Sequence, residues 1–250
     1  MRFEGVHAAT EMSGNGRGLP RITRERLPAV SADQMREVDR AMIEDVHIDL
    51  VQMMENAGRS LADLALGLFG RSSVAVLAGA GGNGGGGLVA ARHLANRGVA
   101  VWVTVSGSEE HLAPVTRHQL DILQRIDVRI VADPPAADLV LDALIGYSLR
   151  GDPAGRAAEL IRWANQQSAP MLSLDTPSGL NVTTGMAGHP CVRATATMTL
   201  ALPKIGLLGA SERVGRLYLA DISVPPVVYE RMGLHVGNPF AEGAIVEVGS

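Results

Sequence analysis

The sequence contains little of what several classes of protein need. Aromatic residues make up 3% of the chain and the net charge is -4, so neither a stacking surface nor a basic groove for nucleic acid is predicted. The one cysteine, Cys191, can form no internal disulfide, which is typical of a reducing compartment. No apolar run reaches the roughly 18 residues that a membrane-spanning helix needs. We therefore expect a cytoplasmic protein whose partners include neither nucleic acid nor membrane.

Residues 1–30 have the composition of a flexible arm. They are polar, contain several glycines and lack the apolar segment of a secretory signal. A short ordered arm that packs on a partner subunit is the alternative. From residue 31 to residue 250 no linker or repeat interrupts the chain, and 46% hydrophobic residues provide an ample core. We expect one domain over residues 31–250.

Two helices are predicted before the first strand of that domain. Ser31 is a typical N-cap, and the apolar residues Met35, Met42 and Ile43 follow at helical spacing. A second helix is expected over residues 49–69, because its apolar residues form one stripe and a glycine follows it.

Strand-like and helix-like segments then alternate. Strands are expected at 74–77, 99–105, 128–131, 138–143 and 170–174, and helices at 88–96, 111–125 and 155–166. This order predicts a parallel sheet covered by helices on both faces. Two more strands, at 195–201 and 217–224, have no clear helix between them, so we expect the end of the sheet to be irregular or partly antiparallel.

Seven of the nine residues 79–87 are glycine, and we expect this segment to be a loop after the first strand. Glycines let backbone N–H groups approach an anion closely at the start of a helix. The segment contains the pattern G-x-G-x-x-G, but no acidic residue ends the following strand, so the dehydrogenase fingerprint is incomplete. No Lys-Ser/Thr closes the segment, which excludes a Walker loop. A turn that serves only to pack the helix on the strand is the alternative.

Acidic side chains stand at the ends of two predicted strands. Asp142 and Asp175 each follow an apolar segment, and a buried carboxylate is costly unless it is bonded or paired. Asp142, Asn83 and Ser178 all offer oxygen atoms with a single negative charge among them, which favours a monovalent cation. The alternative for each aspartate is that it only orients its own loop.

Several motifs in one order give the sequence a resemblance to a known family. They lie at residues 31–35, 54–58, 87–94, 142–144, 175–179, 201–204 and 221–225. Through them the chain resembles the YjeF N-terminal domain family, which includes the NAD(P)HX epimerases and the vertebrate apolipoprotein A-I binding protein. The resemblance implies a Rossmann-like three-layer α/β sandwich, a homodimer, and an isomerase that interconverts the R and S forms of hydrated NADH or NADPH. It also implies that the dehydratase many bacterial members carry at their C-terminus resides on another protein.

The resemblance further implies a set of site residues. A potassium ion would be bound by Asn83, Asp142 and Ser178. Asp175 is expected to act as general acid/base at the carbon that is inverted. The expected substrate-binding residues are Gly82, Asn83, Gly84, Gly85, Gly86, Gly146, Tyr147, Ser148, Leu149, Arg150, Gly151, Asp152 and Asp175. Lys204 is either a charge-stabilising residue of this site or a solvated surface lysine.

Two segments depart from the family pattern. The family reads Asn-Asn-Gly-Gly-Asp-Gly where residues 82–87 read Gly-Asn-Gly-Gly-Gly-Gly, and usually Gly-Thr-Gly-Leu where residues 146–149 read Gly-Tyr-Ser-Leu. Each polar group left unpaired can change ligand affinity by about 1–3 kcal/mol. The alternative function is therefore a YjeF-type isomerase or cyclase acting on a small imine, iminium or polyketide-like substrate. A non-catalytic scaffold is a third interpretation, against which the retained polar residues argue.

Overall fold

The computed structural model describes residues 18–71 and 73–249, which contain a mostly parallel sheet of nine strands. The strand order is β1-β9-β8-β7-β6-β5-β2-β3-β4, and each neighbouring pair is parallel except β8 and β9. The strands are β1 (Arg21–Thr23), β2 (Val74–Ala78), β3 (Val101–Val105), β4 (Arg129–Ile130), β5 (Leu139–Ala143), β6 (Met171–Leu174), β7 (Ala196–Leu200), β8 (Arg216–Ala220) and β9 (Ile245–Gly249).

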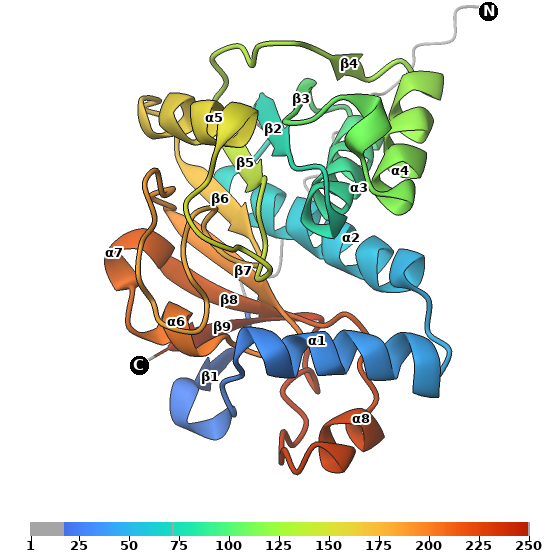
Figure 1. The fold of residues 1–250 in the computed structure, drawn as a ribbon, viewed down its shortest axis with the longest axis vertical. Helices are drawn as coiled ribbons and strands as arrows, with labels where there is room; N and C mark the ends of the chain where they lie inside the picture. The colour runs from blue at the N-terminus through green and yellow to red at the C-terminus, as the bar shows by residue number, and fades with distance from the viewer. Residues whose placement is uncertain (1–17, 72, 250) are drawn as a thin grey trace, which may run out of the picture.

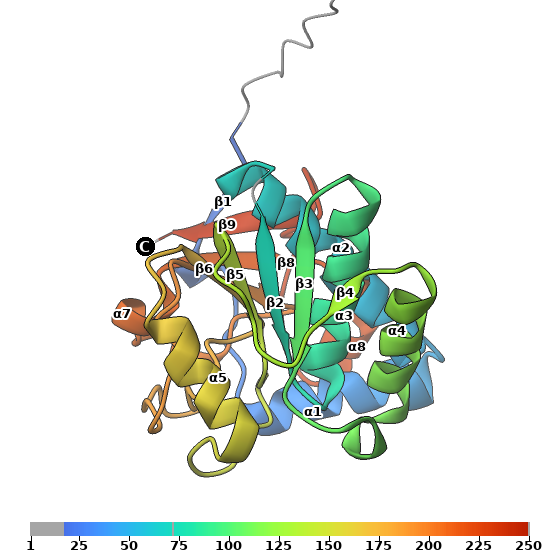
Figure 2. The same cartoon turned by 90° about the horizontal axis from the view of Figure 1, so that it is seen from above.

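Helices cover both faces of this sheet (Figures 1 and 2). Figure 2 shows α5 on one side of the central strands and α3 and α4 on the other, with α2 beside α3. The helices are α1 (Ala32–Arg40), α2 (Leu50–Phe69), α3 (Gly82–Asn96), α4 (Pro114–Arg125), α5 (Gly155–Asn165), α6 (Ile205–Leu208), α7 (Ser211–Val214) and α8 (Pro226–Arg231). The expected Rossmann-like three-layer α/β sandwich is confirmed.

Alternate residues of the central strands pack on opposite helical layers. Val76 belongs to the core beneath α2, α3 and α4, whereas its neighbour Leu77 packs with Leu160 and Ile161 of α5. All five residues of β2 are buried, as expected of a parallel strand with both faces covered. This two-sided burial is why the strands read as continuous apolar runs in the sequence.

The first helix begins where the sequence predicts and ends earlier than expected. The Ser31 side chain accepts a hydrogen bond from the Gln34 backbone, and the Gln34 side chain accepts one from the Ser31 backbone, which forms a capping box. A π-helical turn over Ala41–Asp45 then changes the register. Ile43 is consequently 41% exposed, so its predicted place in the buried stripe is wrong.

The glycine segment is not a loop, which corrects the prediction for residues 79–87. Helix α3 begins at Gly82, so most of these glycines form its first turns. A Cβ atom on Gly84 would lie 1.8 Å from the carbonyl oxygen of Gly79, and one on Gly87 would lie 2.5 Å from the Cβ of Ala143. Close packing of the helix on β2 and β5 therefore outweighs the low helix propensity of glycine.

Both ends of the described chain add strands to the far edge of the sheet. β1 pairs in parallel with β9, Leu27 is buried, and Val30 forms a bridge with Lys204. The arm predicted for residues 1–30 is thus part of the fold from β1 onwards, because this segment completes the sheet, and residues 1–17 lie outside the described part. β9 was not predicted, and its antiparallel pairing with β8 agrees with the expected irregularity of the sheet at this end.

Candidate active site

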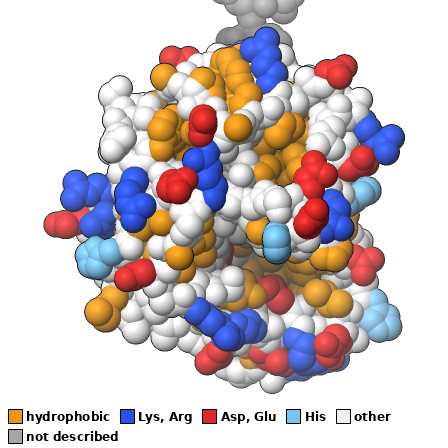
Figure 3. All heavy atoms as spheres, turned by 45° about the horizontal axis from the view of Figure 1, so that its top comes forward, with side chains coloured by type: hydrophobic (Ala, Val, Ile, Leu, Met, Phe, Trp, Pro, Cys, Tyr) orange, Lys and Arg blue, Asp and Glu red, His pale blue; other side chains and the backbone are white. Residues whose placement is uncertain are grey.

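A cavity of about 430 Å³ lies at the carboxyl ends of β2, β5, β6 and β7, where α1, α2 and the start of α3 meet them. Parallel α/β sheets bind their ligands at this edge, and the volume lies in the range usual for small-molecule sites. Figure 3 shows one face of the molecule, with hydrophobic side chains gathered in its hollowed lower part.

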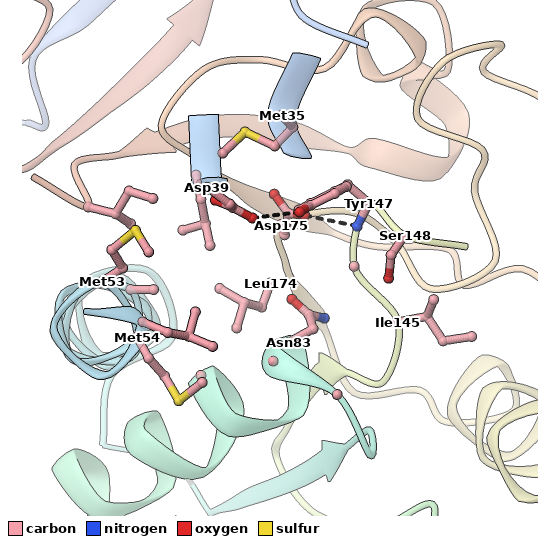
Figure 4. Close-up of a pocket in the computed structure, with 18 of the residues that line it drawn as sticks. Met35, Asp39, Met53, Met54, Asn83, Ile145, Tyr147, Ser148, Leu174 and Asp175 are labelled. Atoms are coloured by element: carbon pink, nitrogen blue, oxygen red, sulfur yellow. Dashed lines mark hydrogen bonds between the residues drawn. The ribbon is translucent and has the colours of Figure 1, made fainter. Parts of the chain in front are cut away.

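One wall of the cavity is apolar and the other is polar. Met35 from α1 and Met53 and Met54 from α2 form much of the apolar wall, and methionine side chains adapt readily to a flat ligand. The polar side chains Asp39, Tyr147 and Asp175 lie together, as Figure 4 shows, with Asn83 at the start of α3.

The centre of the polar wall is a buried ion pair. Asp175 follows β6, and the side chain of Lys204 donates to its Oδ1 at 2.5 Å while it also donates to the carbonyl of Leu200 at 2.9 Å and to the hydroxyl of Thr199 at 3.2 Å. The side chains of Lys204 and Asp175 are 0% and 4% exposed. The interpretation of Lys204 as a solvated surface lysine is therefore wrong, because the turn after β7 places it under the cavity.

Asp175 has a second partner across the cavity edge. Its Oδ2 accepts a hydrogen bond from the backbone N–H of Tyr147 at 3.1 Å. The carboxylate is thereby oriented by an ammonium on one oxygen and by an amide on the other, which is the fixed geometry that an acid/base group requires.

Asp142 is fully buried beneath the cavity floor. It accepts hydrogen bonds from the hydroxyl of Ser173, from the backbone and hydroxyl of Ser178, and from the backbone of Leu144. Burial raises the pKa of the Asp142 carboxyl, and these hydrogen bonds oppose that rise. Ser178 in turn accepts from the Ile145 backbone at 2.8 Å, so the segment after β5 is tied to the segment after β6.

Asn83 is directed at the same segment from the start of α3. A Cβ atom on Gly146 would lie 3.2 Å from both the side-chain oxygen of Asn83 and an oxygen of Asp175, so these two side chains approach the Gly146 backbone closely. Within the described residues the Asn83 Nδ2 atom is buried without a hydrogen-bond partner. This N–H group is therefore free to donate to an acceptor atom of a bound ligand or to water.

The residues Asn83, Asp142 and Ser178 fit a monovalent cation in their chemistry. All three offer oxygen atoms, only Asp142 carries a charge, and the segment 145–146 contacts both Asn83 and Ser178. The described chain contains no cluster of three or more histidine, cysteine, aspartate or glutamate side chains that could hold a metal.

The structure brings about half of the predicted substrate-binding residues to the cavity. Those that line it are Gly82, Asn83, Gly86, Gly146, Tyr147, Ser148 and Asp175. Gly84 and Gly85 instead pack on Gly79 and Met54, and Leu149, Arg150, Gly151 and Asp152 lie beyond the lining. The carboxylate of Asp152 accepts a hydrogen bond from the His189 backbone at 2.9 Å.

Asp39 is an acidic residue of the cavity lining that sequence analysis missed. It lies on α1 one turn after Met35, and its Oδ2 accepts a hydrogen bond from the Tyr147 hydroxyl at 2.5 Å. Burial raises the pKa of Asp39, while the hydrogen bond from Tyr147 opposes the rise. Burial, then the neighbouring Asp39, also raises the pKa of the Tyr147 phenol. An acidic residue in the apolar stripe of a helix was the signal that could have identified it.

Two residues of reactive type lie outside the cavity lining. His93 Nε2 lies 2.8 Å from Glu55 Oε1 on the face between α2 and α3. Cys191 is buried, and burial raises the pKa of its thiol to about 11.

In the described part of the chain no helix has both the length and the apolar character needed to cross a bilayer.

The sequence matches a known protein family and several curated proteins. The model of the YjeF-related protein N-terminus matches residues 50–206. An NAD(P)H-hydrate epimerase of Dehalogenimonas lykanthroporepellens is 47% identical over 234 residues, which cover 90% of this chain and 94% of that protein. A bifunctional NAD(P)H-hydrate repair enzyme of Hyperthermus butylicus is 42% identical over 76% of this chain, which spans only 38% of that protein.

The fold also has a relative of known structure. A yeast protein solved by crystallography superposes with a TM-score of 0.79 at 23% identity, over 89% of this chain and all of that one. At this identity the likeness concerns the fold alone. Together with the match over residues 50–206 and the 47% identity to the Dehalogenimonas protein, it leads to one conclusion: the chain belongs to the YjeF N-terminal domain family.

Proposed function

We propose that this protein is an NAD(P)H-hydrate epimerase, an isomerase that interconverts the R and S forms of hydrated NADH and NADPH. Relatives of that name support the activity, since one is 47% identical over nearly its whole length and another, from Rhodopirellula baltica, is 34% identical over 86% of its length. The observation on this chain that supports it best is the oriented carboxylate of Asp175 at the wall of a cavity with an apolar side.

In the proposed arrangement one edge of the hydrated nicotinamide ring lies against the methionines of α1 and α2, so that neither face is covered by them, and the carbon to be inverted lies between Asp175 and the Tyr147 hydroxyl. The phosphates lie toward the start of α3, where Gly85 donates the first helical hydrogen bond to Gly81. The N–H groups before it have no intrahelical partner and are available to an anion. Lys204 fixes the position of the Asp175 side chain through their direct contact.

A potassium ion is proposed as the cofactor. Asn83, Asp142 and Ser178 would hold it through their side-chain oxygens, and this all-oxygen set with a single carboxylate supports the assignment. The ion would supply a fixed positive charge beside the phosphates.

A homodimer and a cytoplasmic location are also proposed. The large apolar residues Ile43, Leu50 and Val51 are 39–45% exposed at the junction of α1 and α2, which supports a subunit contact there. Light scattering of the purified protein tests the dimer, and fractionation of cells tests the location, which the single buried cysteine supports.

The test of the activity is epimerisation of purified R-NADPHX, followed by chromatographic separation of the two epimers with and without potassium. Asp175→Asn should lose the acceleration, whereas Asp121→Asn, an exposed residue paired with Arg125 on α4, should keep it. No acceleration above the spontaneous rate by the folded wild-type protein would contradict the proposal. Binding of a small imine instead of ADP-ribose would then favour the alternative function of a repurposed isomerase or cyclase.

A further inference from the structure

We propose that Tyr147 and Asp39 form a second acid/base pair of the cavity, in which the Tyr147 hydroxyl contacts the substrate and Asp39 acts through it. This inference rests on the proposed epimerase function and adds two roles to it. Tyr147 would be a catalytic residue and Asp39 a positioning and proton-accepting residue behind it.

Tyr147 forms hydrogen bonds through its backbone N–H and through its side-chain hydroxyl. Its backbone N–H donates to Asp175 Oδ2 at 3.1 Å, and its hydroxyl donates to Asp39 Oδ2 at 2.5 Å, as the dashed lines of Figure 4 mark. All three residues line the same cavity. The Tyr147 hydroxyl is thus fixed at the cavity by a carboxylate that comes from another helix.

Asp39 differs from Asp175 in its charge partner. Lys204 contacts Asp175 directly and acts on Asp39 only through space, and within the described residues Asp39 forms no ion pair of its own. The other charged groups that face this pair are Asp175, which opposes ionisation of Asp39, and Arg36, which acts on the Tyr147 phenol. Because burial raises the pKa of Asp39, it is a better proton acceptor than an exposed carboxylate.

The proposed reaction needs two proton-transfer groups. Water added to the enamine double bond of a dihydropyridine places the hydroxyl on the carbon next to the ring nitrogen, since nitrogen stabilises positive charge there. Inversion breaks the C–O bond as the nitrogen lone pair forms C=N⁺, and the leaving oxygen takes a proton and departs as water. A water molecule then adds to the opposite face, its lone pair forms the new C–O bond, the π electrons return to nitrogen, and a proton is released.

The Asp175–Lys204 pair supplies the proton that the leaving oxygen takes. The Tyr147–Asp39 pair receives the proton that the attacking water releases. The attacking water gives its proton to the Tyr147 oxygen while the Tyr147 hydroxyl proton passes to Asp39 Oδ2 along the existing hydrogen bond. The phenol ends neutral, Asp39 has gained one proton and the Asp175–Lys204 pair has lost one. That state is the starting point of the reverse conversion, and for a further turnover in the same direction Asp39 gives one proton to solvent water while the Asp175–Lys204 pair takes one from it.

The test compares Tyr147→Phe, Asp39→Asn and the double variant with wild type in the epimerisation of R-NADPHX. Removal of a general acid/base group typically lowers a rate about 10²–10⁴-fold. We expect kcat to fall at least about 100-fold in each single variant with KM changed less than about threefold, and the double variant to be no slower than the single ones, because the two residues act as one unit.

Tyr218→Phe is the matched control. It also removes a buried hydroxyl, one without a hydrogen-bond partner in the described part of the chain, and it lies on β8 away from the cavity. We expect it to keep wild-type kcat, and thermal unfolding of all variants verifies the fold. Should Tyr147→Phe be unfolded, Asp39→Asn decides alone, since an amide can still accept the phenol hydrogen bond but not the proton.

Each outcome separates this inference from the proposed function. If the wild-type protein accelerates epimerisation and Tyr147→Phe or Asp39→Asn keeps the wild-type kcat, the second acid/base pair is refuted. The proposed epimerase function is then unaffected. A changed KM with unchanged kcat would assign Tyr147 to substrate fit alone and also overturns it. Failure of wild type to accelerate the reaction at all removes the proposed function, and the second pair with it.

Discussion

Replacing Lys204 by methionine tests whether the buried ion pair with Asp175 is formed as the structure shows. Methionine is similar in length and apolar, so Lys204→Met leaves the Asp175 carboxylate 4% exposed without its charge partner. Removing one partner of a buried pair costs about 3–5 kcal/mol of the free energy of unfolding. For a chain of this size each kcal/mol corresponds to about 2–4 °C, so the melting temperature should fall by roughly 6–20 °C.

Thermal unfolding followed by circular dichroism measures this change, and the double variant Lys204→Met, Asp175→Asn is its control. The double variant should recover most of the lost stability, because no unpaired charge remains. A melting temperature of Lys204→Met within about 2 °C of wild type would refute the reasoning. It would mean that water in the cavity solvates Asp175 as well as the ammonium does.

Further predictions concern packing, pH and the thiol. Gly84→Ala should be destabilised strongly, because its Cβ would lie 1.8 Å from a backbone oxygen, whereas Gly82→Ala has open space and should melt within about 3 °C of wild type; differential scanning fluorimetry compares the two. Because burial raises the pKa of Asp39 above its usual 3.8, the stability it contributes is present in acid and is lost as pH rises through the folded pKa. Asp39→Asn should therefore gain melting temperature relative to wild type at about pH 7, and this gain should shrink toward about pH 4; an equal gain at both pH values would contradict the pKa assignment. Cys191, with a pKa of about 11, should resist a maleimide at about pH 8 in the native protein and react after unfolding, as mass spectrometry would detect.

The local sequence was sufficient to predict most elements of the sheet. Short apolar strands and the helices between them have different periods, and the capping box at Ser31 marks a helix start without any tertiary information. The ends of parallel strands meet at one edge, so Asp142 and Asp175 could be assigned to one region from the sequence. The structure confirms that they lie at this edge, each in its own hydrogen-bond network.

Other features could not be predicted because they depend on which distant segments meet. The glycines after β2 are predicted as a loop by propensity, yet Gly84 and Gly87 are helical. The backbone of Gly79, just after β2, and the Ala143 side chain of β5 approach them too closely for larger residues. β1 and β9 lie at opposite ends of the chain and are strands chiefly because they pair with each other and with β8. Neither segment has a hydrophobic periodicity from which this strand pairing could be predicted.

The sequence by itself determined the family motifs, the α/β class and the position of Asp175, because these depend on spacing and residue type along the chain. Tertiary structure alone decided that Lys204 is buried against Asp175 and that Asp39 of α1 holds the Tyr147 hydroxyl. The partners in these contacts are 29 and 108 residues apart. The physical reason is that burial and charge pairing belong to the assembled environment of a side chain, which no local pattern contains.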